Sequence, residues 1–332
     1  MEKNDIEIIN KNLGNLTFKN KNVLITGGSG FLGSWMCETV LAQGGQVICI
    51  DNYSSGTENN INNFKNNRRF TEIHHDITHP LEINSTIDYV FHMASRASPF
   101  EFNRFPLEIL KSNTLGTINA LEIAKKFNAV CLFTSTSEIY GDPQITPTPE
   151  IYRGNVNTLG IRGCYDEAKR AGEAICMAYL REFRLNIRIA RIFNTYGPRM
   201  RGDGFYGRVI PRFIDQALNN RPITIFGDGT QTRSFCYVTD QIEGLIRLAL
   251  TPGLAGEAVN IGYPGEITIN ELARRIITIT GSDSELEFQP LPEDDPKRRC
   301  PDITKVKQLL HWTPKTDLDT GLKKIVQIYR KK

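Results

Sequence analysis

The chain has 332 residues, of which 40% are hydrophobic, and its 40 Lys and Arg residues nearly balance its 37 Asp and Glu residues to a net charge of +3. This balance creates no strong field for binding nucleic acid or a membrane surface, and no apolar run approaches the ~18 residues that span a bilayer. The polar, asparagine-rich start lacks the apolar core of a signal peptide. We therefore expect a cytoplasmic protein with a loose polar extension over residues 1–20.

Short apolar runs alternate with helical patterns from residue 22 to residue 192. Residues 22–26 and 46–51 predict strands, and apolar residues at helical spacing predict a helix from Gly30 to about Gln43. The same alternation continues with strands at 87–93, 129–135 and 186–192 and helices at 105–126 and 165–183. It predicts an α/β fold with a doubly wound parallel sheet of the Rossmann type, whose ligands bind at the carboxyl ends of the strands.

After about residue 195 the sequence becomes richer in Gly, Arg and Tyr and predicts shorter elements. We expect residues 21–195 to form the dinucleotide-binding domain, with the chain crossing back to it near 235–262. Residues 196–330 are then a smaller C-terminal lobe that covers the sheet edge and contacts the substrate. The final KIVQIYRKK predicts a short helix with a solvated basic end.

Cysteine and histidine spacing favours neither disulfides nor a metal. The cysteine count is odd, no CxxC occurs, and most of the cysteines lie in apolar runs, which indicates buried, reduced thiols. His74, His75 and Asp76 are adjacent, but no HExxH or Cys/His spacing accompanies them. We expect no metal site.

Three glycines predict a dinucleotide site. Gly27, Gly30 and Gly33 follow the first strand and open the next helix, where a backbone turn can approach a pyrophosphate and the helix N-terminus offers free N–H groups. Asp51, which closes the second strand, can accept hydrogen bonds from ribose hydroxyls and would repel a 2′-phosphate. The following NYSSG contains no Arg to hold such a phosphate, so we expect NAD rather than NADP.

Tyr165 and Lys169 lie four residues apart and therefore on one face of a predicted helix. A free tyrosine has a pKa near ~10, too high for a base at neutral pH, and a neighbouring ammonium would lower it. The pair predicts a general acid/base for a hydroxyl group beside a hydride acceptor.

Longer strings carry a resemblance to a known family. TGGSGFLGS (26–34), HMAS (92–95) and YDEAK (165–169), in this order, resemble the extended short-chain dehydrogenase/reductase superfamily over roughly residues 20–325. TSTSEIYGDP (134–143), ARIFNTYGPRM (190–200), FGDGTQTRSFCYVTD (226–240) and DDPKRRCPDITK (294–305) resemble its nucleotide-sugar branch. The match is greatest to the UDP-glucuronic acid decarboxylases, also called UDP-xylose synthases.

The resemblance implies an NAD cofactor, a UDP-sugar substrate and a set of contact residues. The implied cofactor contacts are Gly27, Gly30, Phe31, Leu32, Gly33, Asp51, Asn52, Ser55, Gly56, Asp76, Ile77, Ala94, Ser95, Ser112, Tyr165 and Lys169. The implied substrate contacts are Lys111, Glu138, Asn194, Arg208, Arg233 and Arg298. Relatives also pair the helix of the Tyr/Lys motif with the helix near 105–126 in a four-helix bundle, so we expect a homodimer.

The implied reaction begins with oxidation of the sugar's 4-hydroxyl. Thr136 would hydrogen-bond that hydroxyl, Tyr165 would take its proton while hydride passes to NAD, and Lys169 would hold the nicotinamide ribose. The ketone made from a glucuronate is β to the carboxylate, so carbon dioxide can leave and the resulting enolate can be stabilised by Thr136 and Tyr165. Return of the hydride gives UDP-xylose and regenerates NAD.

Four residues separate this reaction from the alternatives. Ser137 stands where the related 4,6-dehydratases carry an acidic proton donor, which disfavours dehydration, and Glu138 and Arg233 are implied at carbon 5 and the sugar carboxylate. Arg96 replaces a proline of the decarboxylase pattern H-x-A-S-P-A-S-P, and a cation there would suit a UDP-glucuronate 4-epimerase or contact a phosphate. A non-catalytic NAD-binding sensor is disfavoured because it has no need of the four side chains that occur together here: Thr136, Glu138, Tyr165 and Lys169.

Overall fold

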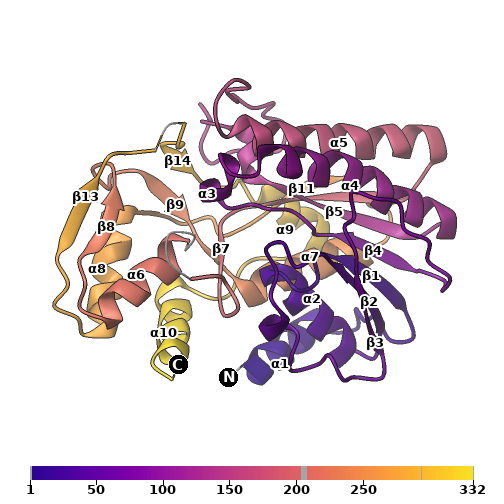
Figure 1. Ribbon diagram of the computed structural model, residues 1–332, viewed down its shortest axis with the longest axis horizontal. Coiled ribbons are helices and arrows are strands. Elements are labelled where there is room, and N and C mark those ends of the chain that lie inside the picture. The colour runs from indigo at the N-terminus through magenta and orange to yellow at the C-terminus, as the bar shows by residue number, and fades with distance from the viewer. Residues whose placement is uncertain (1, 203–207, 293, 332) are drawn as a thin grey trace.

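The protein is built around a seven-stranded parallel sheet (Figure 1). The computed structural model describes residues 2–202, 208–292 and 294–331. The strands lie in the order β11-β6-β5-β4-β1-β2-β3, and every neighbouring pair is parallel. Their bounds are β1 Asn22–Thr26, β2 Gln46–Asp51, β3 Phe70–His74, β4 Tyr89–His92, β5 Val130–Thr136, β6 Ile187–Ile192 and β11 Ala258–Ile261. The predicted α/β fold with a doubly wound parallel sheet is confirmed.

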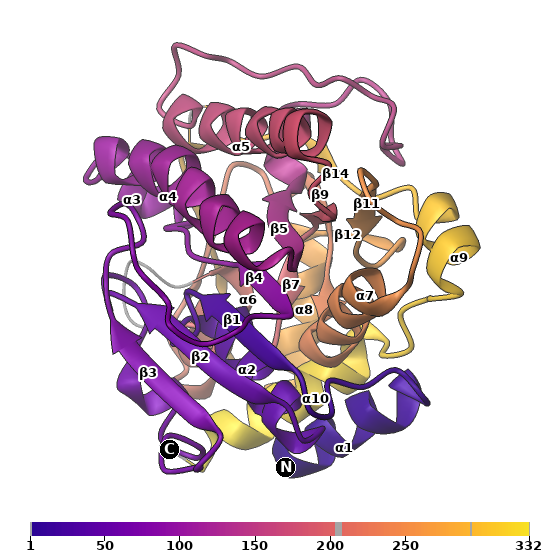
Figure 2. The same ribbon diagram turned by 90° about the vertical axis from the view of Figure 1, so that its right-hand side faces the viewer.

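Helices cover both faces of the sheet (Figure 2). On one face lie α4 (Pro106–Phe127) and α5 (Gly163–Phe183), and on the other lie α2 (Phe31–Ala42) and α7 (Val238–Leu250). Successive side chains of a strand point to opposite faces, so Leu24 belongs to the core under α4 and α5, whereas Val23 and Ile25 belong to the core under α2 and α7. Burial on both faces explains why these strands are continuous apolar runs.

The strand order identifies the edge of the sheet at which ligands bind in folds of this type. Since β1 lies between β2 and β4, the chain winds outward in both directions from this point, and the loops after β1 and β4 diverge at the carboxyl edge of the sheet. Between residues 22 and 192, the predicted strands and helices agree with the structure to within about two residues. Strand β3 was not predicted, and α7 and β11 were expected only as the chain crossing back near 235–262. β3 is an edge strand in which Phe70 is buried, Ile73 is half-buried and the other residues are exposed, so its sequence has no apolar run.

The loose extension expected over residues 1–20 is wrong, because residues 2–13 form helix α1 (Glu2–Leu13). Ile6, Ile9 and Leu13 form an apolar stripe, are 6% exposed or less, and pack with α2 and α7. Asp5 is 1% exposed and accepts hydrogen bonds from the Tyr237 hydroxyl at 3.0 Å and Lys324 Nζ at 2.8 Å. The N-terminal segment is therefore tied to the body of the protein.

A second group of short elements stands beside the carboxyl edge (Figure 1). Its sheets pair β8 (Ile223–Phe226) with β13 (Leu286–Gln289), β9 (Thr232–Ser234) with β12 (Glu266–Thr268) and β14 (Arg298–Arg299), and β7 (Thr195–Tyr196) with β10 (Cys236–Tyr237). Its helices are α6 (Val209–Leu218), α8 (Ile269–Thr280) and α10 (Leu318–Tyr329), and α9 (Thr304–Leu310) packs on β11. The chain returns to the main sheet at β11, and α10 contains most of the predicted C-terminal helix. The division into domains at residue 195 stays a prediction.

The short helices α3 (Pro99–Phe102), η1 (Glu58–Asn60) and η2 (Ser137–Tyr140) lie in loops that leave the sheet. All seven cysteines are free, and six of them are buried: Cys37, Cys49, Cys131, Cys176, Cys236 and Cys300. The expectation of buried, reduced thiols is thus confirmed for these six, whereas Cys164 is half-buried. Within the described ranges, no helix combines the length and the apolar character needed to cross a membrane.

Candidate active site

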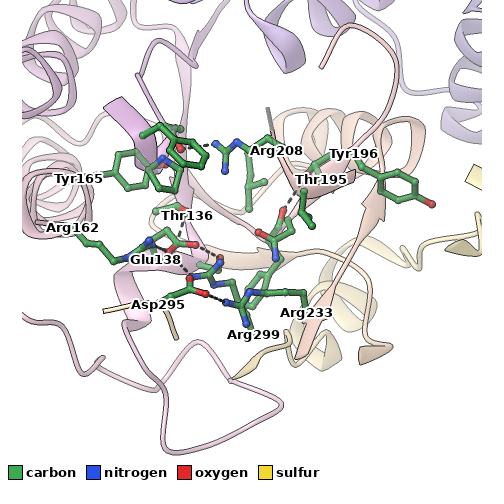
Figure 3. A pocket seen from close by; sticks show the side chains of 18 of the residues that line it. Thr136, Glu138, Arg162, Tyr165, Thr195, Tyr196, Arg208, Arg233, Asp295 and Arg299 are labelled. Atoms are coloured by element: carbon green, nitrogen blue, oxygen red, sulfur yellow. Dashed lines mark hydrogen bonds and ion pairs between the residues drawn. The ribbon is translucent and has the colours of Figure 1, made fainter. Parts of the chain in front are cut away.

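A cavity of about 830 Å³ lies between the carboxyl edge of the sheet and the C-terminal lobe (Figure 3). The sheet contributes the end of β5, with Thr136, and η2, with Glu138, and α5 contributes Tyr165. The lobe contributes the side chains of Arg233 and Asp295, among others. The volume falls in the range of ~300–1,000 Å³ that is common for small-molecule sites.

The glycine turn after β1 fits a phosphate-bearing cofactor. Gly27 has φ +72°, and a Cβ atom there would lie 2.7 Å from Cα of Ala94, while a Cβ on Gly33 would lie 2.1 Å from the Gly27 carbonyl oxygen. Helix α2 begins without a side-chain cap and without an acidic residue in its first turn, so its first N–H groups and its positive dipole end are open to an anion. The Ser29 hydroxyl is also buried without a partner among the described residues.

Asp51 stands at the end of β2, as expected for a ribose contact. Its two carboxylate oxygens accept hydrogen bonds from the backbone N–H groups of Ser29 at 2.9 Å and Tyr53 at 2.8 Å. Each oxygen retains a further lone pair for a ligand hydroxyl. A Cβ on Gly56 would lie 2.1 Å from the Ser29 hydroxyl, so only glycine lets the loop that follows, with Asn52 and Ser55, close over this carboxylate.

The remaining predicted cofactor residues lie along the same edge. Asn52 donates to Asp76 at 3.1 Å and joins the loops after β2 and β3, the carbonyl of the buried Ile77 accepts from Asn119 at 2.8 Å, and the Ser112 hydroxyl donates to the Ile109 carbonyl inside α4. Of the predicted cofactor contacts, Phe31, Leu32, Ser95, Tyr165 and Lys169 line the cavity itself. For all of the predicted residues, contact with the cofactor stays a prediction.

Sequence reasoning missed Thr26 and His92, which fix the loop after β4. Thr26 Oγ1 accepts N–H bonds from Met93 at 3.1 Å and Ala94 at 3.2 Å, so its own proton points to His92 Nδ1, 2.8 Å away. Burial, together with the charge of Lys169, lowers the pKa of His92 to about 3, so this imidazole is neutral. The signal was present in the sequence, because the H of HMAS closes a strand at the ligand edge.

Tyr165 and Lys169 lie on α5 and face the end of β5. Tyr165 is 6% exposed and stacks on Phe102 with ring centroids 5.4 Å apart, and Lys169 Nζ donates to the Thr134 carbonyl at 2.7 Å. The lowered pKa expected for Tyr165 is wrong for this structure, because burial raises it to about 12 although the Thr136 hydroxyl opposes this effect. Burial also lowers the pKa of Lys169 to about 7, so this amine is only partly protonated at neutral pH.

Thr136 and Ser137 connect the strand end to Glu138. Thr136 closes β5 and its hydroxyl accepts the N–H of Glu138 at 3.3 Å, which caps the short helix η2. The Ser137 hydroxyl donates to Glu138 Oε1 at 3.3 Å. A single turn of chain therefore places a hydroxyl and a carboxylate at the floor of the cavity.

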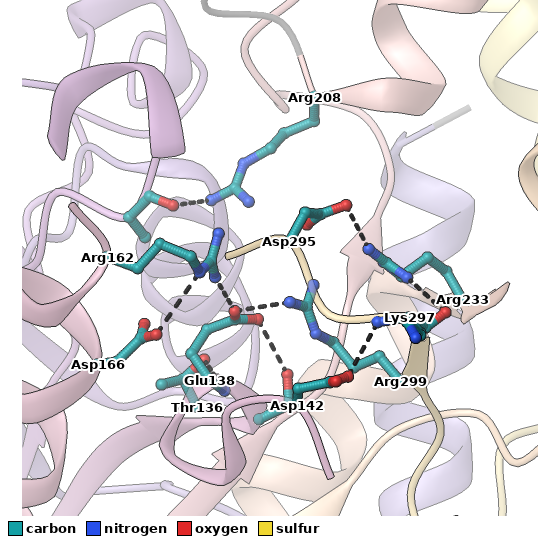
Figure 4. A network of polar contacts seen from close by, with 12 residues as sticks. Thr136, Glu138, Asp142, Arg162, Asp166, Arg208, Arg233, Asp295, Lys297 and Arg299 are labelled. Carbon is teal, nitrogen blue, oxygen red and sulfur yellow. Dashed lines mark hydrogen bonds and ion pairs between the residues drawn. The ribbon is translucent and has the colours of Figure 1, made fainter. Parts of the chain in front are cut away.

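Glu138 is held by two arginines that sequence reasoning did not select (Figure 4). Its Oε2 atom accepts from Arg162, which precedes α5, and from Arg299 Nη2 at 2.7 Å. Burial alone would raise the pKa of Glu138, but the charges of Arg299, Arg162 and Arg233 outweigh it and the pKa is lowered. Glu138 is therefore an ionised carboxylate inside a cationic cage.

The alternation of strand β14 separates Arg299 from the predicted substrate contact Arg298. Arg299 lies opposite Arg233 in the pairing of β14 with β9, on the cavity side, whereas Arg298 lies opposite Thr232. The Arg298 side chain is 53% exposed and pairs with Glu266, so the structure does not support its assignment to the substrate. Two adjacent arginines point to opposite faces, and only the strand register identifies the one that enters the site.

The other predicted substrate contacts divide in the same way. Asn194, Arg208 and Arg233 line the cavity, where Arg208 donates to the Ala97 carbonyl and Arg233 donates to Asp295 at 2.7 Å. Lys111 is exposed on α4 and is not among the residues around the cavity, so its assignment is not supported either. Lys111 lies within a helix and not at the end of a strand, so the sequence did not fix the direction in which its side chain points.

Arg96, which departs from the decarboxylase pattern, is occupied elsewhere. Its guanidinium pairs with Glu101 at 2.6 Å and lies 4.2 Å from the Phe105 ring centroid. It is not one of the described residues that line the cavity. In this structure Arg96 therefore offers no cation to a sugar carboxylate or a phosphate. No group of three His, Cys, Asp or Glu side chains that could hold a metal occurs in the part of the chain that the structure describes.

Comparisons with known proteins agree with this architecture. UDP-glucuronic acid decarboxylase 5 of Arabidopsis thaliana is 45% identical over 94% of this chain and 90% of its own length, and UDP-glucuronic acid decarboxylase 1 of Xenopus tropicalis is 43% identical over 94% and 72%. Among solved structures, UDP-glucose 4-epimerase from Thermotoga maritima, bound to UDP-glucose, is 31% identical with a TM-score of 0.84 over 93% of this chain and 99% of that chain.

A further solved structure holds an acidic nucleotide sugar. UDP-glucuronic acid 4-epimerase from Bacillus cereus, in complex with UDP-glucuronic acid and NAD, is 29% identical with a TM-score of 0.82 over 93% of this chain and 99% of that chain. Residues 23–262 match the model of the NAD dependent epimerase/dehydratase family. This match takes in the whole glycine turn, the Tyr165/Lys169 helix and the return to the main sheet at β11, and the protein belongs to the NAD-dependent epimerase/dehydratase family.

Proposed function

We propose that the protein converts UDP-glucuronate to UDP-xylose and carbon dioxide in a redox-neutral reaction that uses NAD. The observation that carries the proposal is Glu138, an ionised carboxylate held by Arg162 and Arg299 one turn after Thr136. The relatives that are 43–45% identical and are named UDP-glucuronic acid decarboxylases support it. Ser137, which occupies the position of a dehydratase's proton donor, points away from dehydration.

The charge of the cavity suits an acidic nucleotide sugar. Among the residues that the structure describes, two acidic side chains line it, Glu138 and Asp295, against six basic ones: Arg162, Lys169, Arg208, Arg212, Arg233 and Arg299. A nucleoside diphosphate linked to a glucuronate carries negative charge at both its diphosphate and its carboxylate, and such ligands favour clusters of arginine. The arginines are spread over both walls of the cavity (Figure 3), so both ends of the ligand can be paired.

Thr136 and Tyr165 perform the proton chemistry at the sugar's 4-hydroxyl. Both side chains line the cavity, and the Thr136 hydroxyl lies close enough to Tyr165 to oppose the rise of its pKa. Bound NAD supplies the hydride acceptor and donor, and Lys169, which the Thr134 carbonyl fixes from behind, is placed to hold its ribose. Tyr165 must be a phenolate to take up the hydroxyl proton during oxidation, and the positive charge of a bound nicotinamide ring would favour that form over the neutral phenol of the cofactor-free protein. It returns the proton during reduction.

Loss of carbon dioxide follows from the ketone at carbon 4. The carbon–carbon bond to the carboxylate breaks, its electron pair forms an enolate, and hydrogen bonds from Thr136 and Tyr165 stabilise the enolate oxygen. One proton from solvent then enters at carbon 5, so the reaction consumes a proton overall. Because its pKa is lowered, Glu138 serves as a hydrogen-bond acceptor that orients the proton donor rather than as the donor itself.

The second candidate is a UDP-glucuronate 4-epimerase, which shares the oxidation but retains the carboxylate. The fold of the Bacillus cereus epimerase favours it in general terms. The one sequence feature that suggested it, Arg96, is paired with Glu101 outside the cavity. The decarboxylase is therefore the better supported of the two.

The deciding experiment is incubation of the purified protein with UDP-glucuronate and NAD. We expect carbon dioxide release and a product lighter than the substrate by that molecule, without net reduction of NAD. An isobaric product without gas release would replace this proposal with the epimerase. A reaction with neither product, after addition of fresh NAD, would exclude both.

A homodimer and a cytoplasmic location belong to the same proposal. Helices α4 and α5 pack side by side, and Leu107 and Leu115 on α4 are 64% and 45% exposed. Ala174 and Ala178, four residues apart on α5, are also exposed, as a closely packed bundle of two such helix pairs requires. Light scattering tests this directly, with Ala174→Glu expected to give monomers.

A further inference from the structure

Arg233 is a buried cation whose requirement for an anion is met by Asp295. Its side chain is 8% exposed, and its Nη2 atom donates to Asp295 Oδ2 at 2.7 Å. Its Nη1 atom donates to the carbonyls of Thr232 at 2.8 Å and Lys297 at 3.4 Å. Burial and the like charge of Arg299 lower the pKa of Arg233 to about 10. Without a carboxylate or phosphate beside it, this guanidinium would be a costly unpaired charge.

Asp295 itself is held much less firmly than its partner. It stands in the loop shortly before β14, its side chain is 25% exposed, and it lines the cavity. Glu138, the other acid among the described residues that line the cavity, is 12% exposed and is bound by two arginines. Figure 4 shows Asp295 reaching Arg233 from the loop side, apart from the Glu138 cluster. Asp295 can therefore leave Arg233 for water, whereas Glu138 and Arg233 are fixed in place.

We propose that Asp295 is a built-in competing anion, which occupies Arg233 in the substrate-free protein and is displaced by the phosphates of a nucleoside diphosphate. The inference rests on the proposed function for the presence of a diphosphate in the substrate. A diphosphate carries more charge than one carboxylate and can engage both nitrogens of the guanidinium fork. Exchange of a partly exposed pair costs little, because water solvates the released carboxylate.

This exchange makes Asp295 a determinant of affinity rather than of chemistry. Each binding event must break the pair between Arg233 and Asp295, so the carboxylate weakens the observed affinity for every ligand that carries the diphosphate. When the product leaves, the carboxylate returns and Arg233 is never left unpaired. Arg233 is thereby assigned to the diphosphate and not to carbon 5 and the sugar carboxylate, where the resemblance placed it, so the sugar-bearing end of the cavity, at Thr136 and Tyr165, is not part of this exchange.

The test is titration of UDP into the NAD-loaded protein, by calorimetry, for the wild type and Asp295→Asn. We expect the variant to bind UDP about 3- to 10-fold more tightly, the range for removal of one partly solvated like charge. KM for UDP-glucuronate should fall by a similar factor while kcat changes by less than about twofold. The difference in UDP affinity should shrink at high salt, because the competing charge is partly exposed.

Asp294→Asn is the matched control. It removes the same charge one residue away, where the carboxylate accepts from the Asn157 amide at 3.2 and 3.1 Å instead of from Arg233. We expect its UDP affinity to stay within about twofold of the wild type, since only the long-range field changes. Asp295→Ser serves as a second variant if the asparagine itself hydrogen-bonds Arg233 and masks the gain.

The possible results distinguish failure of the role proposed for Asp295 from failure of the proposed function. Equal or weaker UDP binding by both Asp295 variants would overturn the inference, because Asp295 would then orient Arg233 for the ligand. An equal gain in Asp294→Asn would overturn it as well, because general charge would explain the effect. Failure of the wild type to bind UDP at all would instead overturn the proposed function, and the inference with it.

Discussion

The two walls of the cavity are stabilised in different ways. On the sheet side, the important side chains are tied to backbone groups: Thr26 to the N–H groups of residues 93 and 94, Asp51 to those of residues 29 and 53, and Lys169 to the Thr134 carbonyl. Where the sheet side meets the lobe, and within the lobe, the contacts are instead ion pairs between side chains far apart in the chain, such as Glu138 with Arg299 and Arg233 with Asp295. Main-chain geometry thus organises the sheet wall, and an ion-pair network organises the part of the cavity that faces the lobe.

This difference predicts different responses to mutation. A residue on the sheet side can lose its reacting atom while its surroundings keep their shape, since the backbone holds them. A residue of the ion-pair network that loses its charge leaves a buried partner unpaired, so stability and activity should change together.

Tyr165→Phe should have the largest effect on turnover and almost none on structure. The stacking on Phe102 and the burial of the ring are retained, and only the hydroxyl is lost. Because that hydroxyl carries the proton of the first step, we expect turnover to fall by at least about 10³-fold. Carbon dioxide release measures the rate, and NAD content by absorbance measures cofactor binding, which should be retained. Appreciable turnover would remove Tyr165 from the proposed role.

Glu138→Gln should lower both activity and stability. The change leaves Arg162 and Arg299 without the carboxylate that both contact. We expect a loss of about 3 kcal/mol in unfolding free energy, as for other broken buried ion pairs, and a fall in turnover of about 100-fold or more. Denaturant unfolding and carbon dioxide release measure the two effects. Ser137→Ala is the control, because it removes one hydrogen bond to Glu138 without changing its charge. An unchanged unfolding free energy in Glu138→Gln would mean that Arg162 and Arg299 do not need a carboxylate between them for the protein to stay folded.

Arg299→Lys and Arg298→Lys compare two neighbours on opposite faces of β14. Lysine keeps the charge but lacks the planar fork of arginine, so Arg299→Lys should weaken the hold on Glu138 and lower turnover about tenfold. Arg298→Lys replaces a 53% exposed partner of Glu266 and should leave turnover within about twofold. The rates of carbon dioxide release by the two variants show which of the two arginines acts in the site. A larger loss at Arg298 would restore the assignment made from the sequence.

The sequence predicted the sheet side better than the lobe side, for physical reasons. Strands buried on both faces must be apolar throughout, so β1, β2, β4, β5 and β6 were visible, and turn glycines and strand-end residues have fixed places relative to them. The edge strand β3 and helix α1 were missed, since one is largely exposed and the other hides its stripe of Ile6, Ile9 and Leu13 among polar residues. In the lobe, Arg299 and Asp295 lie in short irregular segments whose direction depends on long-range pairing, and no local pattern records that pairing.

Asp166, which lies beside Arg162 on α5, tests the ion-pair network through pH, with a smaller expected effect. It is 4% exposed, its Oδ2 atom lies 3.5 Å from Arg162 Nε, and its Oδ1 atom has no partner within the described chain. Burial, and then the charge of Glu138, raise the pKa of Asp166 to about 7, although Arg162 and Arg299 oppose this. Arg162 is therefore committed mainly to Glu138, and Asp166 is still partly protonated at neutral pH.

The sign of the pH effect follows from this raised pKa. In the unfolded chain an aspartate loses its proton near pH ~4, whereas folded Asp166 retains it up to about pH 7. Between these values the folded state binds more protons, so this residue lowers stability as the pH rises through the window and contributes its full penalty above it. Asp166→Asn cannot ionise, so its unfolding free energy should exceed that of the wild type by a margin that grows with pH. The margin should increase by on the order of 2 kcal/mol from pH 5 to pH 8. Urea unfolding at both values measures the gain, and a constant difference between the two proteins would show that Asp166 ionises normally and that Arg162 serves both carboxylates equally.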